Sequence, residues 1–226
     1  MDGMVQVQNR ILKADMYYKN SLVLQYKIQH PWFESIPFFQ SVIRMNQYYT
    51  AKSADYQQYC RQELYLSAAE QYDYSVKNNF PVRVFEAVQN YTITYNQDCA
   101  VSLYFDKYQY TGGAHGSTIR YSDTWNLKSG VRIMLKQLFS SAIPYRTYII
   151  NAINHQIAAQ ISQGDNIYFD DYEKSVVNYF NPDSYYLTEE GIVIYFQQYE
   201  IAPYASGLPE FKIPYLIGAV TQPYCC

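Results

Sequence analysis

Histidine is the side chain most often used as a general base or metal ligand near neutral pH, so the three histidines are the first candidates for chemistry. His115 lies in a glycine-rich stretch, TGGAHG at residues 111–116, whereas His30 and His155 lie in a strand end and a helical pattern. None has a second histidine at the HxxxH or HExxH spacing of zinc hydrolases. A lone histidine completes neither a metal site nor a charge relay. The sequence therefore favours a structural role for His115 over a ligand contact, and a ligand contact over catalysis.

Paired carboxylates occur as Asp170-Asp171 and Glu189-Glu190, and neither pair has the partners that metal or acid–base chemistry requires. Metal-dependent polysaccharide deacetylases use an Asp-Asp pair with an HxxxH group to hold the ion that activates water. Asp170-Asp171 has no histidine in range and is predicted to start a helix, while Glu189-Glu190 is predicted to lie in a turn. The chain has no GxSxG elbow and no phosphate loop. We predict a protein that is not an enzyme and that has no metal and no cofactor.

The four cysteines show neither a metal-ligand spacing nor the pattern of a disulfide framework. Cys60 and Cys99 lie inside patterned segments and are predicted to be small buried hydrophobic residues. Cys225 and Cys226 end the chain, without CxxC spacing and without a histidine nearby. We predict an exposed, mobile tail for these two, with reactive thiols or intermolecular crosslinks as the alternative.

The composition is rich in tyrosine and poor in charge, with 28 tyrosines among 226 residues and 16% charged residues. The net charge of −3 comes without a basic patch, which argues against nucleic acid as a partner. Tyrosine combines an apolar ring with a polar tip, so it suits half-buried sheets and wet recognition surfaces alike. We expect most tyrosines in the core or in sheets, and a broad aromatic recognition surface is the alternative.

The first 20 residues contain no apolar run long enough for a signal peptide or a membrane span. The sequence as given therefore predicts no membrane span and carries no export signal. Two explanations remain open: a leader outside this sequence, or a protein that works inside the cell that makes it.

Two alternating segments, residues 101–110 and 117–127, enter and leave the glycine-rich stretch and must position His115. Their period of two is typical of half-buried strands. Three glycines between them allow backbone angles that other residues avoid, so a sharp bend or a bulge is expected there. We predict a central antiparallel pair of strands with a kinked crossing.

Strand and helix patterns occur in blocks along the rest of the chain, which predicts an α+β fold. A long N-terminal helix is expected from Pro37 to about Val76, where apolar residues recur at spacings of three, four and seven. His30-Pro31 is predicted to end the preceding strand, because proline cannot donate to a ladder. The remaining predicted elements are strands at 3–12, 21–30, 82–95, 131–133, 185–187, 192–196 and 211–213, a hairpin turn at 96–98, and helices at 144–163 and 170–179.

Residues 199–209 are the second place where the sequence could carry a function. Pro203, Pro209 and Gly207 stiffen this segment, from which Tyr199 and Tyr204 are expected to project. A loop that is already ordered binds well, because little ordering remains to be done on binding. The favoured interpretation is that the segment wraps over the core and fixes the last strand, and ligand binding is the alternative.

Three segments resemble a bacterial family: YQYTGGAHGST at 108–118, TWNLKSGVRIMLKQLF at 124–139 and YYLTEEGIVIYFQQYEIAPYASGLPEFKIPY at 185–215. The family pairs an N-terminal domain shared with the peptidoglycan deacetylase PdaC and a C-terminal domain shared with the anti-sigma-V factor RsiV. The resemblance extends from about residue 20 to 215, and two long motifs in the right order are much more specific than a single glycine loop. Gln137 departs from the pattern, since the family often has an acidic residue there.

The resemblance implies two intertwined halves, a PdaC-like one at 1–115 and an RsiV-like one at 116–226. It also implies a cell-envelope or extracellular setting in Gram-positive bacteria and, for one branch, the binding of lysozyme. That branch has a membrane helix and a cytoplasmic segment that holds a sigma factor, and neither occurs in this sequence. Only the sensing or binding domain is therefore carried over.

Three hypotheses follow. The first is a non-enzymatic ligand-binding or sensing domain of the cell envelope, with a lysozyme-like protein or a cell-wall glycan as partner. The second is a structural protein of a spore or surface layer, crosslinked through tyrosine or cysteine and cytoplasmic or spore-associated. The third is a peptidoglycan hydrolase with a site around His115 and Tyr110. The oligomeric state stays open, and the ligand-binding candidates are Tyr108, Tyr110, Gly112, Gly113, His115, Tyr199 and Tyr204.

Overall fold

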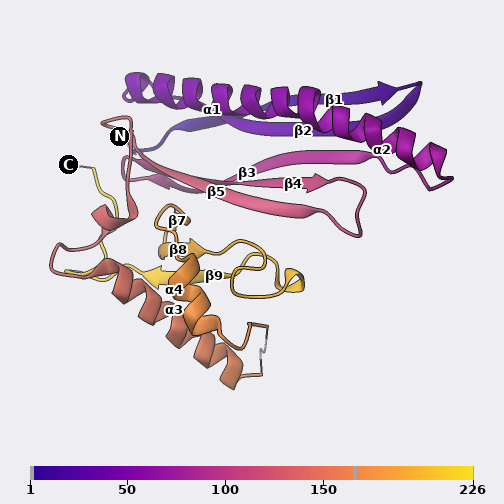
Figure 1. Ribbon diagram of the computed structural model, residues 1–226. Helices are drawn as coiled ribbons and strands as arrows, with labels where there is room; N and C mark the ends of the chain where they lie inside the picture. Colours follow the sequence, from indigo (N-terminus) through magenta and orange to yellow (C-terminus); the bar gives the residue numbers. More distant parts are fainter. Residues whose placement is uncertain (1–2, 165–166, 226) are drawn as a thin grey trace. The chain divides into compact units, whose positions relative to one another are not determined.

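The computed structural model describes residues 3–164 and 167–225, which form the predicted α+β fold (Figure 1). The long N-terminal helix is confirmed: α1 (Phe39–Tyr59) continues through a π-helical segment (Cys60–Leu64) into α2 (Tyr65–Lys77). The later helices are α3 (Tyr145–Ser162) and α4 (Tyr172–Tyr179). The strands are β1 (Gln6–Tyr18), β2 (Ser21–Glu34), β3 (Phe85–Gln97), β4 (Ala100–Tyr110), β5 (Ser117–Asn126), β6 (Val131–Arg132), β7 (Tyr185–Thr188), β8 (Gly191–Tyr195) and β9 (Glu210–Pro214).

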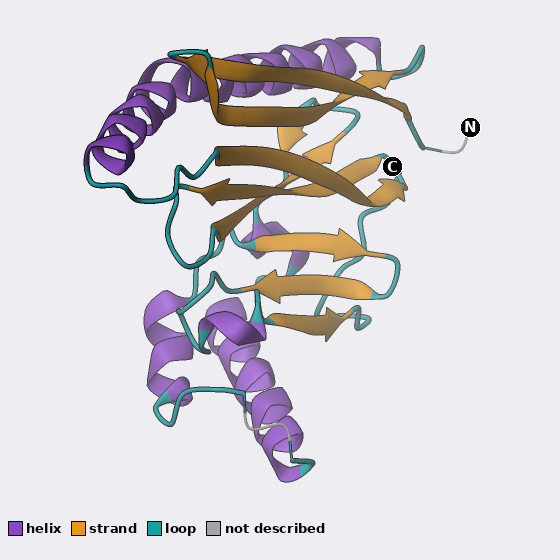
Figure 2. Ribbon diagram, turned by 90° about the vertical axis from the view of Figure 1, so that its right-hand side faces the viewer, coloured by secondary structure: helices purple, strands orange, loops and turns teal. Residues whose placement is uncertain are grey.

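The strands form two sheets, one of six strands in the order β1-β2-β3-β4-β5-β6 and one of three in the order β7-β8-β9 (Figure 2). β1 and β2 are an antiparallel hairpin, whereas β2 and β3 run parallel, with Leu24 opposite Phe85. A parallel neighbour requires a long crossover connection, and the helix of α1 and α2 supplies it. The three-stranded sheet is antiparallel throughout.

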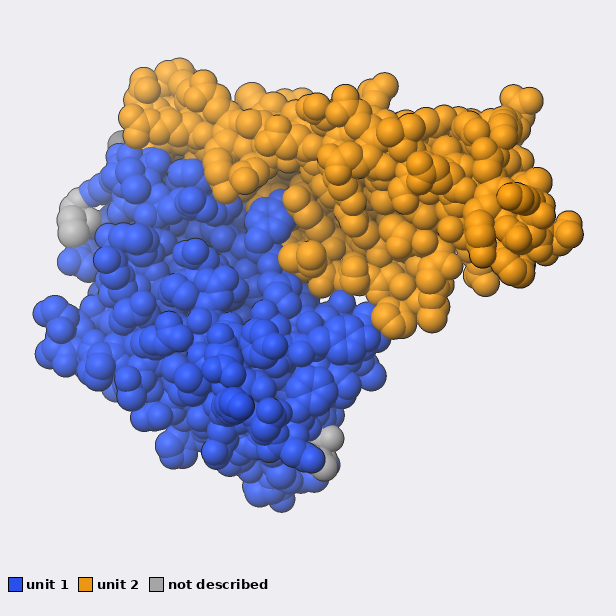
Figure 3. Space-filling view, in the orientation of Figure 1, with its two compact units in different colours: residues 1–4, 92–104, 120–226 blue, residues 5–91, 105–119 orange. Residues whose placement is uncertain are grey.

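The chain forms two compact units (Figure 3). The described part of unit 1 contains residues 3–4, 92–104, 120–164 and 167–225, and unit 2 contains residues 5–91 and 105–119. β3, β4 and β5 each continue from one unit into the other, so the units interleave in the sequence. The predicted boundary at residue 115 separates two family domains and stays a prediction.

Unit 2 is a helix packed on a sheet. Alternate residues of β2, Leu24, Tyr26 and Ile28, are buried against the helix face that carries Tyr56 and Cys60. The opposite face of β2, with Gln25 and Lys27, is exposed. This alternation is the period of two that the sequence shows from residue 21 to 30.

Unit 1 has a separate apolar core between α3 and the three-stranded sheet. Ile149, Ile153 and Ile157 recur at a spacing of four and are fully buried, because this spacing places them on one side of the helix. They belong to one cluster with Leu187, Ile192, Ile194, Phe211 and Ile213 of the sheet.

The prediction that His30-Pro31 ends the second strand is wrong, because β2 runs on to Glu34. Pro31 lies opposite Asn9 of β1, and the described pairing of β2 with β3 stops at Ile28. Beyond Ile28 the strand therefore needs donors on one side only, and a proline is tolerated there. The first strand is also longer than predicted: it covers Gln6–Tyr18 instead of residues 3–12.

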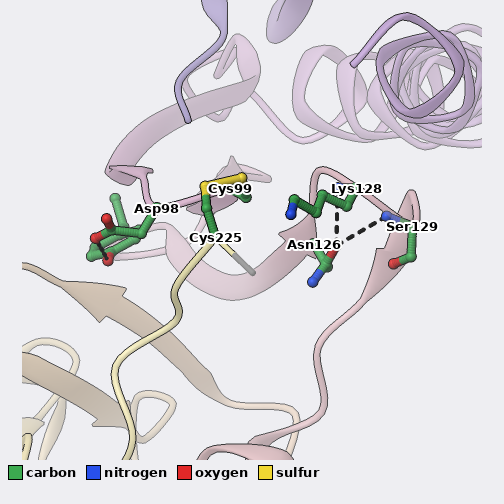
Figure 4. Close-up of a disulfide and its surroundings, with 7 residues drawn as sticks. Asp98, Cys99, Asn126, Lys128, Ser129 and Cys225 are labelled. Carbon is green, nitrogen blue, oxygen red and sulfur yellow. Dashed lines mark hydrogen bonds between the residues drawn. A yellow bond between two sulfur atoms is a disulfide. The ribbon is translucent and has the colours of Figure 1, made fainter. Parts of the chain in front are cut away.

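The prediction that the cysteines form no disulfide is also wrong, since Cys99 and Cys225 are joined, with their Cα atoms 5.3 Å apart (Figure 4). Cys99 belongs to the two-residue turn between β3 and β4, and both Asp98 (φ 52°) and Cys99 (φ 58°) have positive φ. Two positive φ angles in a two-residue loop are the pattern of a tight hairpin turn. Cys225 is therefore tethered, not part of a mobile tail, while Cys60 is a buried free thiol, as predicted.

Among the helices of the described residues, none has the length and apolar character that crossing a membrane requires.

Candidate functional site

The glycine-rich turn of unit 2 is held by the packing of Tyr108 on Gly116. A Cβ atom on Gly116 would lie 2.3 Å from the Tyr108 ring, so no larger residue fits without moving that ring. Gly112 has φ +87°, a backbone angle that side chains rarely adopt. Gly113 is exposed and its added Cβ would meet no atom closer than 3.9 Å. Two of the three glycines are thus required by the geometry of the turn.

His115 lies on the outside of this turn. Its Nδ1 atom is 3.0 Å from the carbonyl oxygen of Gly116, so a proton on Nδ1 is donated to that oxygen. Tyr110 is half-buried at the end of β4. The geometry is consistent with the structural role favoured by the sequence, and ligand binding by this turn stays a prediction.

The segment after β8, in unit 1, brings Tyr199 and Tyr204 together. Their ring centroids are 5.9 Å apart and the ring planes are tilted by 34°. Tyr199 is 55% exposed and has φ +67°, which is uncommon for a residue other than glycine and marks a position held by its surroundings. The structure therefore presents a pair of aromatic rings on a loop.

Contacts on both sides of Tyr199 keep this loop in place. The Ile201 carbonyl accepts a bond from the Phe169 amide at 3.1 Å, and the side chain of Ile201 is fully buried. Before Tyr199, the amide of Gln197 donates to Oε2 of Glu200 at 2.6 Å. Burial raises the pKa of the Glu200 carboxyl, and the Gln197 amide opposes this effect. The loop is thus fixed by backbone bonds and by a buried apolar anchor.

A buried arginine, which the sequence analysis did not single out, also supports the loop. The side chain of Gln197 accepts a bond from the Arg120 amide at 2.9 Å and donates to the Arg120 carbonyl at 2.7 Å. The Arg120 guanidinium lies 3.7 Å from the ring centroid of Tyr104 and is paired with Glu210. These partners are far apart in the sequence, and no local pattern indicates them.

Unit 2 contains a second charged cluster that the sequence did not reveal. The Lys107 ammonium lies 4.3 Å from the centroid of the Tyr56 ring, and burial lowers the pKa of this lysine. Burial also raises the pKa of the Cys60 thiol to about 11, so little thiolate exists at neutral pH. Cys60 opens the π-helical segment. Such segments are frequent at functional sites, but the buried thiol is chemically inert here.

A hollow of about 270 Å³ lies beside the disulfide, lined by Asp98, Cys99, Asn126, Ile133, Gln137, Leu138 and residues 221–224. A shallow groove of about 430 Å³ lies on the exposed face of β1, β2 and β3. Within residues 3–164 and 167–225, no three histidine, cysteine or acidic side chains gather in a way that could hold a metal ion.

The predicted candidates thus fall into two groups. Tyr199 and Tyr204 are brought into contact in unit 1, and Tyr108, Tyr110, Gly112, Gly113 and His115 share one hairpin in unit 2. Each group lies within a single unit.

Together, the interleaved units, the disulfide and the ordered aromatic loop define a tyrosine-rich α+β protein. Two family models match the chain: "Deacetylase PdaC" over residues 18–118 and "Protein of unknown function (DUF3298)" over residues 136–216. The two matches fit a family type that combines a PdaC domain with a DUF3298 domain, as the resemblance to PdaC and RsiV proteins predicts.

Solved structures of the DUF3298 family share this fold. A member from Bacteroides fragilis NCTC 9343 is similar with a TM-score of 0.73 and 16% identity, over 99% of this chain and 96% of that one. A protein from Pseudomonas aeruginosa PAO1 is similar with a TM-score of 0.62 and 17% identity, over 96% of this chain and 95% of that one. No curated protein matches the sequence.

Proposed function

We propose that this chain is a non-enzymatic binding domain of the bacterial cell envelope, and that its DUF3298 segment binds a lysozyme-like protein. The observation that carries the proposal is the pair of Tyr199 and Tyr204, which lies inside the matched segment on an ordered loop. Binding by lysozyme-like partners is what the resemblance to RsiV suggests for this half of the chain.

The physical support is that the loop loses little freedom on binding. Ordering a loop and its side chains opposes association, and this loop is already fixed by Gln197, Ile201 and its two prolines, Pro203 and Pro209. Tyrosine offers a large contact area with few rotatable bonds, and it is enriched among the residues that dominate binding energy. Tyr199, exposed at the tip, is the stronger candidate of the two.

The disulfide supports a location outside the cytoplasm. Disulfides persist in oxidising compartments and are rare where thiols are kept reduced. Cys99 and Cys225 are linked within one chain, which also leaves the second hypothesis, crosslinking in a spore or surface layer, without one of its two terminal thiols. The envelope is therefore the location that we propose.

The proposal that the domain is not an enzyme has its support in the sequence. The PdaC model is named after a deacetylase, yet Asp170-Asp171 lies outside the matched residues 18–118, and the chain has no HxxxH group. A hydrolase centred on His115 would need partners that the sequence does not supply.

The test is titration calorimetry of the whole chain against a C-type lysozyme at low and high salt. We expect one-to-one binding that persists at high salt, because the loop contributes aromatic contacts and little charge. Tyr199→Ala should weaken binding by about tenfold or more. Tyr179→Ala is the matched control, since Tyr179 is a similarly exposed tyrosine of α4 in the same unit.

Absence of heat at high concentration would refute lysozyme as the ligand. Binding that both substitutions leave unchanged would refute the loop as its site. Cosedimentation with insoluble peptidoglycan, with the same two variants, then tests a cell-wall glycan as the ligand.

A further inference from the structure

The free edge of β1 is the feature of unit 2 that fits a partner of known chemistry. β1 is the first strand in the order of the six-stranded sheet, and β2 is its hydrogen-bonded neighbour. In the part of the chain that the structure describes, no strand pairs with its other edge. An unpaired row of backbone N–H and C=O groups is a template for another strand.

This edge lacks the usual steric protection. β1 contains neither proline nor glycine over Gln6–Tyr18. The irregularity of the hairpin falls on β2, because Met16 pairs with Leu24 and the next residue, Tyr17, pairs with Leu22. The exposure of β1 accordingly alternates without interruption from Ile11 to Tyr18. Residues 11–18 of β1 are therefore regular enough to pair with a second strand.

Two like charges face each other across β1 and β2. Lys13 lies directly opposite Lys27 of β2, and like charges in opposite positions are destabilising. Asp15 is on the same exposed face, two residues further along, and accepts a hydrogen bond from Gln25 at 2.9 Å. The edge thus carries a lysine beside another lysine, next to a carboxylate.

We infer that β1 pairs antiparallel with β1 of a second copy of this chain, around a two-fold axis that is perpendicular to the sheet and passes midway between the two copies of Ala14. Lys13 then faces Asp15 of the second copy, and Asp15 faces its Lys13, so both lysines obtain a counter-ion. An axis perpendicular to the sheet keeps the buried and exposed faces of the two copies on the same sides.

Apolar residues match in the same register. Leu12 faces Met16 of the second copy on the helix side of the sheet, where both are partly buried against the core cluster. Ile11 faces Tyr17 of the second copy on the open side, and these residues are 48% and 58% exposed in the single chain. Cross-strand pairs of this kind stabilise a sheet.

Neighbouring registers are disfavoured by charge. An axis midway between the two copies of Lys13 places these lysines opposite each other, and an axis midway between the two copies of Asp15 does the same with the two carboxylates. A slip by one residue would place core-facing side chains opposite solvent-facing ones. The order lysine, alanine, aspartate at residues 13–15 therefore selects the axis between the two copies of Ala14.

The test is sedimentation velocity of the whole chain over a hundredfold range of concentration. We expect a reversible dimer for the natural sequence. Lys13→Asp and Asp15→Lys should each weaken it by about tenfold or more, because two attractive pairs become repulsive. The double variant Lys13→Asp/Asp15→Lys exchanges the charges and should restore the dimer. A mixture of the two single variants should form a heterodimer, since every pair is then attractive again.

Lys128→Asp and Glu189→Lys are matched controls, which make the same charge changes at exposed positions outside β1. They should leave the dimer unchanged. A natural chain that stays monomeric throughout would overturn the proposal. So would single variants that behave like their controls, or a double variant that fails to restore association.

Discussion

Breaking the Cys99–Cys225 disulfide should cost a large share of the stability of this protein. The bond ties the end of the chain to the turn between β3 and β4. The C-terminal segment has other contacts there: the Thr221 amide donates to the Leu138 carbonyl at 2.8 Å, and the Gln222 amide group donates to the Tyr95 hydroxyl at 3.1 Å. These two hydrogen bonds remain available after reduction, so the loss reports mainly on the covalent link.

The magnitude follows from the sequence separation of 126 residues between the two cysteines. In the chain-entropy model, a crosslink restricts the unfolded state in proportion to the logarithm of the loop length. A loop of this size corresponds to about 5 kcal/mol at 25 °C. Folded domains are stable by only about 5–15 kcal/mol, so the reduced protein should be near its stability threshold.

The assay is equilibrium unfolding in guanidinium chloride, carried out in a Cys226→Ser background so that Cys226 cannot replace its neighbour. Adding dithiothreitol and making Cys225→Ser should lower the free energy of unfolding equally, with a fall in the midpoint of about 1 M. Dithiothreitol should have no effect on the Cys225→Ser variant, which is the control for reductant acting elsewhere. Non-reducing peptide mapping should recover the peptides of Cys99 and Cys225 as one species.

Two results would refute this reasoning. A loss below about 1 kcal/mol would show that the loop is not constrained as its length predicts. Mapping that finds Cys99 as a free thiol in the oxidised protein would show that the bond does not form, and the argument for an envelope location would fail with it.

Two further predictions concern unit 2. Gly116→Ala should destabilise the protein by about 1–3 kcal/mol in thermal or chemical unfolding, because the new Cβ overlaps the Tyr108 ring. Gly113→Ala is the control and should be nearly neutral, because its surroundings are open. Equal effects of the two substitutions would contradict the packing of Tyr108 on Gly116. Burial, with a smaller effect of Arg10, lowers the pKa of His30 below its usual 6.5, so stability is complete above pH 6.5 and falls as the pH drops toward the lower pKa of the folded state. His30→Gln should lack this component of acid destabilisation. The check is the free energy of unfolding of both proteins, measured between pH 7 and 5.5. An equal loss of stability over this range in both proteins would contradict the prediction.

The elements of the fold were predictable where one segment determines them. The helix from residue 39 to 77 has an uninterrupted apolar face, and β2 alternates strictly over Leu24, Tyr26 and Ile28, so local periodicity is sufficient. The end of β2 was not predictable in this way. Whether Pro31 stops a strand depends on whether a neighbour needs its missing N–H, and that neighbour, β3, begins more than 50 residues later.

In the candidate site, too, some features depend on local sequence and others on residues that are far away in the chain. The stiffness of the Tyr199 loop and the special backbone of the glycine turn are local properties of proline and glycine, and both loops were selected from the sequence for that reason. What fixes the Tyr199 loop is not local. The Gln197 side chain forms hydrogen bonds with both the N–H and the C=O of Arg120, which lies 77 residues earlier. It thus satisfies the backbone groups that a neighbouring strand would otherwise bind.

The disulfide was missed because its two cysteines come together only through contacts between distant parts of the chain. Cys99 looks like a buried hydrophobic residue because it lies inside a patterned segment, and Cys225 looks like part of a free tail because nothing in residues 221–226 shows a partner. Only the fold brings them within bonding distance. The same fold that orders the aromatic loop through Arg120 also forms this bond, and the proposed envelope location rests on it because disulfides persist in oxidising compartments.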